Sequence, residues 1–241
     1  MKTLTREVIE QGQIMICSDS KPHPYIIRVL DQNDFIEIME LQRNLIAVME
    51  KKELYVPISN EELEFMLQGH GESLGLFIQD QLYAVCSLLF DVPYENNMAR
   101  ELGFGEAELA LVAQLELSLV DPDLRGHKLQ HKLAGILANR AEARKRSKYL
   151  FTTVSPYNYP SITTVTSLGL HIARLCKMYY NWDRFVVYRD FIHPIQLDTT
   201  NTVILPNTAF DEQQQLLNNG YRGFSQFKDE EGIKILYAKI I

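Results

Sequence analysis

LELSLVDPDLRGHKLQHKL, residues 115–133, is the stretch of this 241-residue sequence that decides the fold. Leucines at every second position predict the end of a buried strand that runs over 107–120. Pro122 and Gly126 then predict a tight turn, and Leu129 and Leu133 predict the start of a helix over 127–148. The stretch therefore reads as a strand, a turn and a helix N-terminus in direct succession.

The start of this predicted helix has the chemistry of an anion site. The N–H groups of a first helical turn have no intrahelical acceptor, and the helix dipole adds positive partial charge at the same end. Basic side chains follow one another closely here: Arg125, His127, Lys128, His131 and Lys132. In a chain of formal net charge −7, a diphosphate ligand would explain this cluster, and a solvated basic helix face is the alternative.

The same stretch resembles the V-x-P-x-x-R-G-x-G-x-G/A signature of the GNAT acyltransferase superfamily. The residues that match in register are Val120, Pro122, Arg125 and Gly126. Lys128 stands at the family's central glycine, and Gln130 stands at its last small position. Since glycine lets a phosphate approach the backbone closely, Lys128 would have to contribute as a phosphate cation instead.

A second resemblance follows downstream. Asn158, Ser161 and Gly169 are similar to the family's N-x-x-A/S…G-F motif, with Leu170 in place of the phenylalanine. In relatives that asparagine commonly lies beside the pantetheine arm of coenzyme A. The resemblance covers about residues 25–191, most of the chain.

The resemblance implies a mixed α/β (α+β) fold, a GNAT-like, largely antiparallel sheet flanked by helices. It implies an acyltransferase domain over 25–194, after an N-terminal extension over 1–24. Residues 195–241 would form a small helix-hairpin appendage packed on the same domain. The implied co-substrate is acetyl-CoA or coenzyme A, with no metal. The implied site residues are Leu119, Val120, Arg125, Gly126, His127, Lys128, Leu129, Gln130, Asn158 and Ser161.

The implied reaction is direct transfer of an acyl group to an amine, of a small molecule or a peptide. It needs a base for the amine, and Glu116 is the candidate, because a carboxylate among leucines would be partly desolvated and its pKa raised. A glutamate that faces solvent or pairs with a cation is the alternative reading. Glu108, expected on the same strand face, is the weaker candidate base.

The proton donor for the leaving thiolate is harder to find. The family's tyrosine position falls on Val165, which carries no proton to give. Tyr157 or Tyr159 from the preceding loop, or a water molecule, would have to serve; packing over the helix is the alternative role for both tyrosines. Together with Lys128 and Gln130, Val165 supports a second hypothesis: a catalytically decayed GNAT-fold module that senses coenzyme A or binds protein.

Regions that form acceptor pockets in relatives are also recognisable. They are the long polar loop 91–106 and the region around Tyr55. An acidic pocket mouth would suit a cationic amine, and a solvated loop is the alternative. The acidic residues of that loop are Asp91, Glu95, Glu101 and Glu106.

Composition excludes several classes of protein. An acidic chain of pI about 5.4 gives no basic stripe for nucleic acid, and none is expected as a partner. No window approaches the roughly 18 apolar residues of a membrane span, and residues 1–13 lack the apolar core of a signal peptide. A cytoplasmic protein is expected, with three buried, reduced cysteines, Cys17, Cys86 and Cys176. Formation of a homodimer is left open.

The remaining elements are expected from pattern alone. Strands are predicted at 13–17, 25–29 and 149–154, and hairpins at 74–90, 171–191 and 221–241. Helices are predicted after Asp34, from Ser59 or Asn60, after residue 160, and over 210–219. The helix after Asp34 is expected to bury Ile36, Met39, Ile46 and Met49. The chain is polar through residues 198–201, and no helix or strand is predicted between residues 195 and 209.

Overall fold

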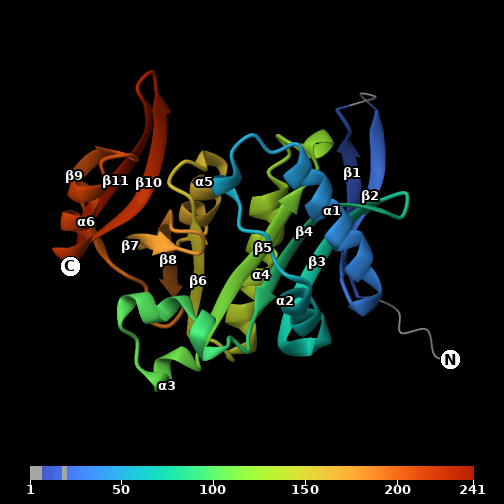
Figure 1. The fold of residues 1–241 in the computed structure, drawn as a ribbon, viewed down its shortest axis with the longest axis horizontal. Coiled ribbons are helices and arrows are strands. Elements are labelled where there is room, and N and C mark those ends of the chain that lie inside the picture. The colour runs from blue at the N-terminus through green and yellow to red at the C-terminus, as the bar shows by residue number, and fades with distance from the viewer. Residues whose placement is uncertain (1–6, 18–20) are drawn as a thin grey trace. The chain divides into compact units, whose positions relative to one another are not determined.

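The computed structural model describes residues 7–17 and 21–241 (Figure 1). Tertiary contacts divide the chain into two compact units. The first unit comprises residues up to Lys52, Pro57–Asp91 and Leu115–Arg140. The second unit comprises Glu53–Val56, Val92–Gln114 and Ala141–Ile241.

The first unit contains a sheet in the order β1-β2-β3-β4-β5. Its strands are β1 (Val8–Met15), β2 (Pro22–Val29), β3 (Gly71–Ile78), β4 (Gln81–Leu89) and the larger part of β5 (Val112–Val120). The pairings from β1 to β4 are antiparallel. Its helices are α1 (Phe35–Ala47), α2 (Asn60–Phe65) and most of α4 (Leu129–Arg144), with short turns at η1 (Gln32–Asp34), η3 (Met66–His70) and η6 (Pro122–Leu124).

The second unit contains a sheet in the order β5-β6-β8-β7-β10-β11-β9, to which β5 gives its first three residues. Only the β5–β6 pairing in this sheet is parallel. The other strands are β6 (Tyr149–Val154), β7 (His171–Met178), β8 (Trp182–Asp190), β9 (Leu197–Pro206), β10 (Tyr221–Asp229) and β11 (Gly232–Ile240). Its helices are α3 (Glu106–Leu109), α5 (Tyr159–Ser167) and α6 (Phe210–Asn218), with turns at η2 (Lys52–Leu54), η4 (Tyr94–Asn96) and η5 (Met98–Leu102). Mostly antiparallel sheet with covering helices confirms the predicted fold class.

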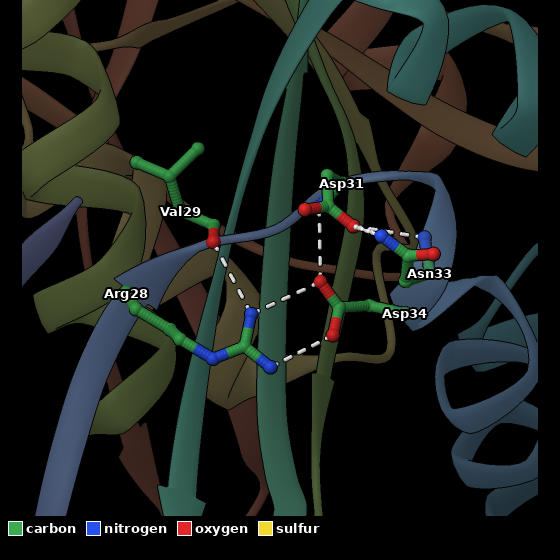
Figure 2. A network of polar contacts seen from close by, with 5 residues as sticks. All are labelled: Arg28, Val29, Asp31, Asn33 and Asp34. Atoms are coloured by element: carbon green, nitrogen blue, oxygen red, sulfur yellow. Dashed lines mark hydrogen bonds and ion pairs between the residues drawn. The ribbon is translucent and has the colours of Figure 1, made fainter. Parts of the chain in front are cut away.

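A buried ion pair joins β2 to the start of α1. Arg28 Nη2 lies 2.7 Å from Asp34 Oδ1, and Arg28 Nη1 lies 3.0 Å from Asp34 Oδ2. Figure 2 shows this two-pronged contact, together with the Asp31 amide that donates to Asp34 Oδ2 at 2.9 Å. The guanidinium also stacks 3.9 Å from the centroid of the Phe77 ring. Arg28 and Asp34 therefore neutralise each other within the first unit.

Several predicted elements need correction. Helix α1 forms after Asp34 as expected, but it buries Ile38, Leu41 and Leu45, while Ile36 is 67% exposed. Pro22 and Pro24 belong to β2, where they pair with β1 alone, because the β2–β3 ladder begins at Tyr25. Strand β9 is not predicted from the sequence, because Asp198–Asn201 are polar, yet it pairs with β11.

We expect Asp34→Ala to lower the free energy of unfolding by about 3–5 kcal/mol, because it leaves the buried Arg28 charge without a counter-ion. Urea unfolding at neutral pH would measure this. The control is Glu40→Ala, which removes an exposed pair to Arg43 at 3.6 Å and is expected to cost no more than about 1 kcal/mol. Equal losses in the two variants would contradict the structural role given to Asp34.

Candidate functional site

The turn between β5 and α4 is fastened at two points. The Asp121 amide donates to the Tyr83 carbonyl at 2.7 Å, and the Asp121 side chain accepts from the Asp123 amide at 2.9 Å. Leu124 is fully buried at the end of η6. Leu119, at 3% exposure, is buried where β5 enters the turn, and Val120 is half-buried. The backbone after Leu124 therefore starts from a defined position.

Two residues of this turn have left-handed backbone conformations. Gly126 has φ 86°, and Lys128 has φ 55°. A lysine rarely adopts this conformation, which costs an L-residue roughly 1–2 kcal/mol. Lys128 stands at the position where the GNAT signature has glycine, so the chain keeps the backbone path that a glycine would favour and adds an ammonium group to it.

This backbone path leaves donors for a ligand. Within residues 7–17 and 21–241, the amides of Gly126, His127, Lys128 and Leu129 donate to no protein acceptor. Arg125, His127 and Lys128 are exposed, whereas Leu129 is 4% exposed and anchors the helix. Free amides and exposed cations at one helix start are suited to bind an anion, and that this turn binds one stays a prediction.

Lys132 was predicted to belong to the basic cluster, but its ammonium group is bound within the protein. Its ammonium group binds the Glu10 carboxylate and the Tyr25 hydroxyl, the latter at 3.1 Å. The hydrogen bond to Lys132 lowers the pKa of Glu10, and the same bond raises the pKa of Lys132. This lysine therefore ties α4 to β1 and β2. Gln130 and His131 are half-buried in the first turn of α4, and both have interactions of their own.

Glu116 lies on β5, ahead of the turn. It is half-buried, and the side chains of Leu115 and Leu117, which are 8% and 1% exposed, point to the opposite face of the strand. The raised pKa and the role of Glu116 as a base stay predictions.

Glu108 is not on the strand, as was expected. It lies in α3, and its carboxylate accepts from the Gly105 amide at 3.1 Å, so it caps that helix. Strand β5 starts only at Val112. The sequence predicts strand at 107–111 because these residues are mostly apolar and a helix as short as α3 shows no clear periodicity.

Asn158 and Ser161 lie together at the start of α5. The Asn158 side chain accepts from the Ser161 amide at 3.2 Å and donates to the Leu54 carbonyl at 3.2 Å. Asn158 is thus the N-cap of α5, and it connects the loop after β6 to the segment that holds Leu54 and Tyr55.

The two candidate tyrosines differ in their surroundings. Tyr157 is 38% exposed, and its ring meets the Phe210 ring edge-on at 6.4 Å between centroids. Tyr159 is half-buried and begins α5. The loop is held from the C-terminal segment by Asn207, which donates to the Pro156 carbonyl at 2.8 Å. Val165 is 5% exposed and belongs to the core.

The cysteines divide by exposure. Cys17 is exposed, which corrects the expectation of three buried thiols. Burial raises the pKa of the Cys86 thiol to about 12 and that of the Cys176 thiol to about 11. Neither of these two is a thiolate at neutral pH, so neither has the state that a nucleophile needs.

Two carboxylates of the acidic loop have partners. Asp91 lies 2.9 Å from His70 Nδ1, and Glu101 forms an ion pair with Arg174, 3.4 Å from its Nε. Glu106 lies in the first turn of α3, and Glu95 lies in η4. The loop is also less irregular than expected, since two short helical turns and α3 occupy most of it. Its acidic character is therefore weaker than the sequence indicates.

Neither the protein-family models nor the curated proteins contain a match to this sequence. Solved structures do match. An acetyltransferase of the GNAT family from Streptococcus pneumoniae is 15% identical, with a TM-score of 0.52, over 69% of this chain and 98% of that one. The chain has the GNAT fold.

Two further structural neighbours were solved with acetyl-CoA. A putative acetyltransferase from Salmonella typhimurium with its cofactor acetyl-CoA is 15% identical, with a TM-score of 0.54, over 73% of this chain and 98% of that one. NAA60 of Arabidopsis thaliana in complex with acetyl-CoA is 10% identical, with a TM-score of 0.56, over 70% of this chain and 99% of that one. At these identities the likeness is one of fold.

Residues 7–17 and 21–241 contain no cluster of three or more His, Cys, Asp or Glu side chains suited to a metal ion, His127 and His131 included. None of the helices formed by the described residues is long and apolar enough to cross a membrane.

We expect Lys128→Gly to be more stable than Lys128→Ala by about 1 kcal/mol, because both remove the charge and only glycine relieves the left-handed backbone. Urea unfolding of the two variants side by side measures the difference. If Lys128→Ala were the more stable variant, Lys128 would not hold the conformation described here.

Proposed function

We propose that this chain is an acyl-CoA-dependent N-acyltransferase that uses acetyl-CoA and transfers its acyl group to an amine of a small molecule or peptide. The observation that carries the proposal is the turn from β5 to α4, where free amides, a left-handed Lys128 and exposed Arg125 coincide on a GNAT fold. The acetyl-CoA named in two of the neighbours supports the choice of co-substrate.

The residues present fit coenzyme A in kind. The amides from Gly126 to Leu129 would hold the diphosphate, with Arg125, His127 and Lys128 adding positive charge. The backbone of Leu119 and Val120, at the end of β5, would hydrogen-bond the pantetheine arm and polarise the thioester carbonyl. The resemblance also assigns Asn158 and Ser161 to coenzyme A, and the Asn158 side chain is bonded to Leu54 and Ser161.

In the proposed reaction, the side chains of this protein act by transferring protons. Glu116, directly or through water, takes a proton from the amine as its nitrogen bonds to the acyl carbon. The carbon–sulfur bond then breaks, and the coenzyme leaves as a thiolate that takes up a proton. Tyr157, which is exposed, is the first candidate donor, and Tyr159, which is half-buried, is the second.

A non-catalytic module is the competing proposal. Its support is Val165, which is buried at the position of the family's proton donor. Such a protein would bind coenzyme A, or a protein partner, and turn nothing over.

Calorimetric titration with acetyl-CoA, followed by assay of thiol release across a panel of amines, separates the two. Binding with thiol release supports the acyltransferase. Binding without release from any amine supports the module. No binding at millimolar acetyl-CoA would refute the acyltransferase and the coenzyme-A-sensing module, and would leave only a module that binds protein.

For the base, we expect Glu116→Gln to lower kcat about 100-fold or more, because a positioned base contributes at least that factor. The affinity for acetyl-CoA should stay the same, since the variant leaves the turn untouched. The control is Glu142→Gln, which removes an exposed carboxylate that binds Arg189 and should leave kcat unchanged. Unaltered turnover in Glu116→Gln would remove Glu116 from the mechanism.

A further inference from the structure

Arg184 occupies an unusual position in the second unit. It lies near the start of β8 and pairs across the sheet with Cys176 of β7. On the other side, Phe185 pairs with Val154, the last residue of β6. Arg184 therefore lies level with Ser155, where β6 gives way to the loop that carries Tyr157 and Asn158.

The guanidinium of Arg184 is buried without a counter-ion. The residue is 2% exposed, and its Nε and Nη2 atoms are inaccessible and make no hydrogen bond. No ion pair links it to any acidic residue that the structure describes. Arg28, the other buried arginine, shows how this chain compensates such a charge for purely structural ends: with a two-pronged carboxylate.

The groups around Arg184 do not replace a counter-ion. The Trp182 and Tyr179 ring centroids lie 5.5 and 5.8 Å from the guanidinium carbon. Burial lowers the pKa of Arg184, and the opposing influence of Tyr179 and of Glu53 is smaller. Arginine keeps its proton in spite of such a shift, so a charged guanidinium is held among rings and a distant carboxylate. Burying a cation in this way is unfavourable unless an anion completes the site.

In the proposed mode of binding, the phosphates of coenzyme A are not the source of that anion, because the diphosphate lies on the turn from β5 to α4 and the 3′-phosphate is on the adenosine beyond it. The pantetheine arm and thioester of coenzyme A carry no charge. An anion at the end of β6 must therefore come from the second substrate, and a planar carboxylate is the group that a guanidinium fork matches best.

We propose that Arg184 binds a carboxylate of the acyl acceptor, so that the acceptor is a small amine bearing a carboxylate, an amino acid or a close derivative. This rests on the proposed N-acyltransferase function. Glu53, within electrostatic reach of Arg184 and next to the Leu54 carbonyl that Asn158 binds, gives the site an opposite charge as well. A site with both signs suits a zwitterion better than the purely cationic amine suggested by the acidic loop.

The test is a panel of amino acids, each paired with its own carboxamide, assayed for acetyl-CoA-dependent thiol release. We expect kcat/KM for the preferred amino acid to exceed that of its amide at least about 100-fold, because a buried cation left unpaired penalises the analogue. Arg184→Gln should remove this preference: kcat/KM falls about 100-fold for the amino acid and changes little for the amide. Arg184→Lys should restore part of it.

Controls separate this proposal from loss of fold or of function. Arg189→Gln removes a partly exposed arginine from the same strand and should leave the preference intact. Arg184→Gln should keep the melting temperature and the acetyl-CoA affinity of the parent. If no amine releases thiol, the proposed catalysis fails, and calorimetric binding of the same panel, with and without coenzyme A, decides the anion site by itself. Carboxylate-dependent binding that Arg184→Gln abolishes supports it.

Two results would overturn the proposal. One is equal use of amides or diamines and amino acids, with Arg184→Gln lowering all rates alike. The other is the absence of any carboxylate-dependent binding or turnover in the parent protein.

Discussion

The anion site depends on one constraint: the backbone from Gly126 to Leu129 must lead into the helix with amides that donate to no acceptor among residues 7–17 and 21–241. The buried Leu124 and Leu129 hold this segment, and the Asp121 amide fixes its entry through Tyr83. Two left-handed residues, Gly126 and Lys128, supply the turn itself. A different path would let these amides pair within the protein, and the cations beside them would then be ordinary surface charge.

Lys128 shows how a departure from a motif can be read physically. A glycine is favoured at such a position because it accepts positive φ without strain and lets a phosphate come close. Lysine at this position has a strained backbone, but it adds a positive charge at the same place. Strain that persists at a candidate ligand site is the pattern expected when function, rather than stability, has set the residue.

The sequence predicted those elements that have a clear apolar pattern or a capping residue. Strand β6 at Tyr149–Val154 and the Ser59 cap of α2 were found as expected, because apolar runs and capping residues act locally. The buried face of α1 was not, since Ile36 and Ile38 are equally apolar and only tertiary packing selects Ile38. The loop residues of the anion site were predictable from the motif. The interactions that occupy Lys132 and Asn158 were not, because their partners are distant in sequence.

The central claim is that this turn binds the diphosphate of coenzyme A, and amide resonances measured by NMR test it most directly. Titration with coenzyme A should shift the amides of Gly126, His127, Lys128 and Leu129, whereas pantetheine, which lacks the diphosphate, should leave these four unmoved. If coenzyme A binds and these amides do not respond, the phosphates lie elsewhere and the account is wrong.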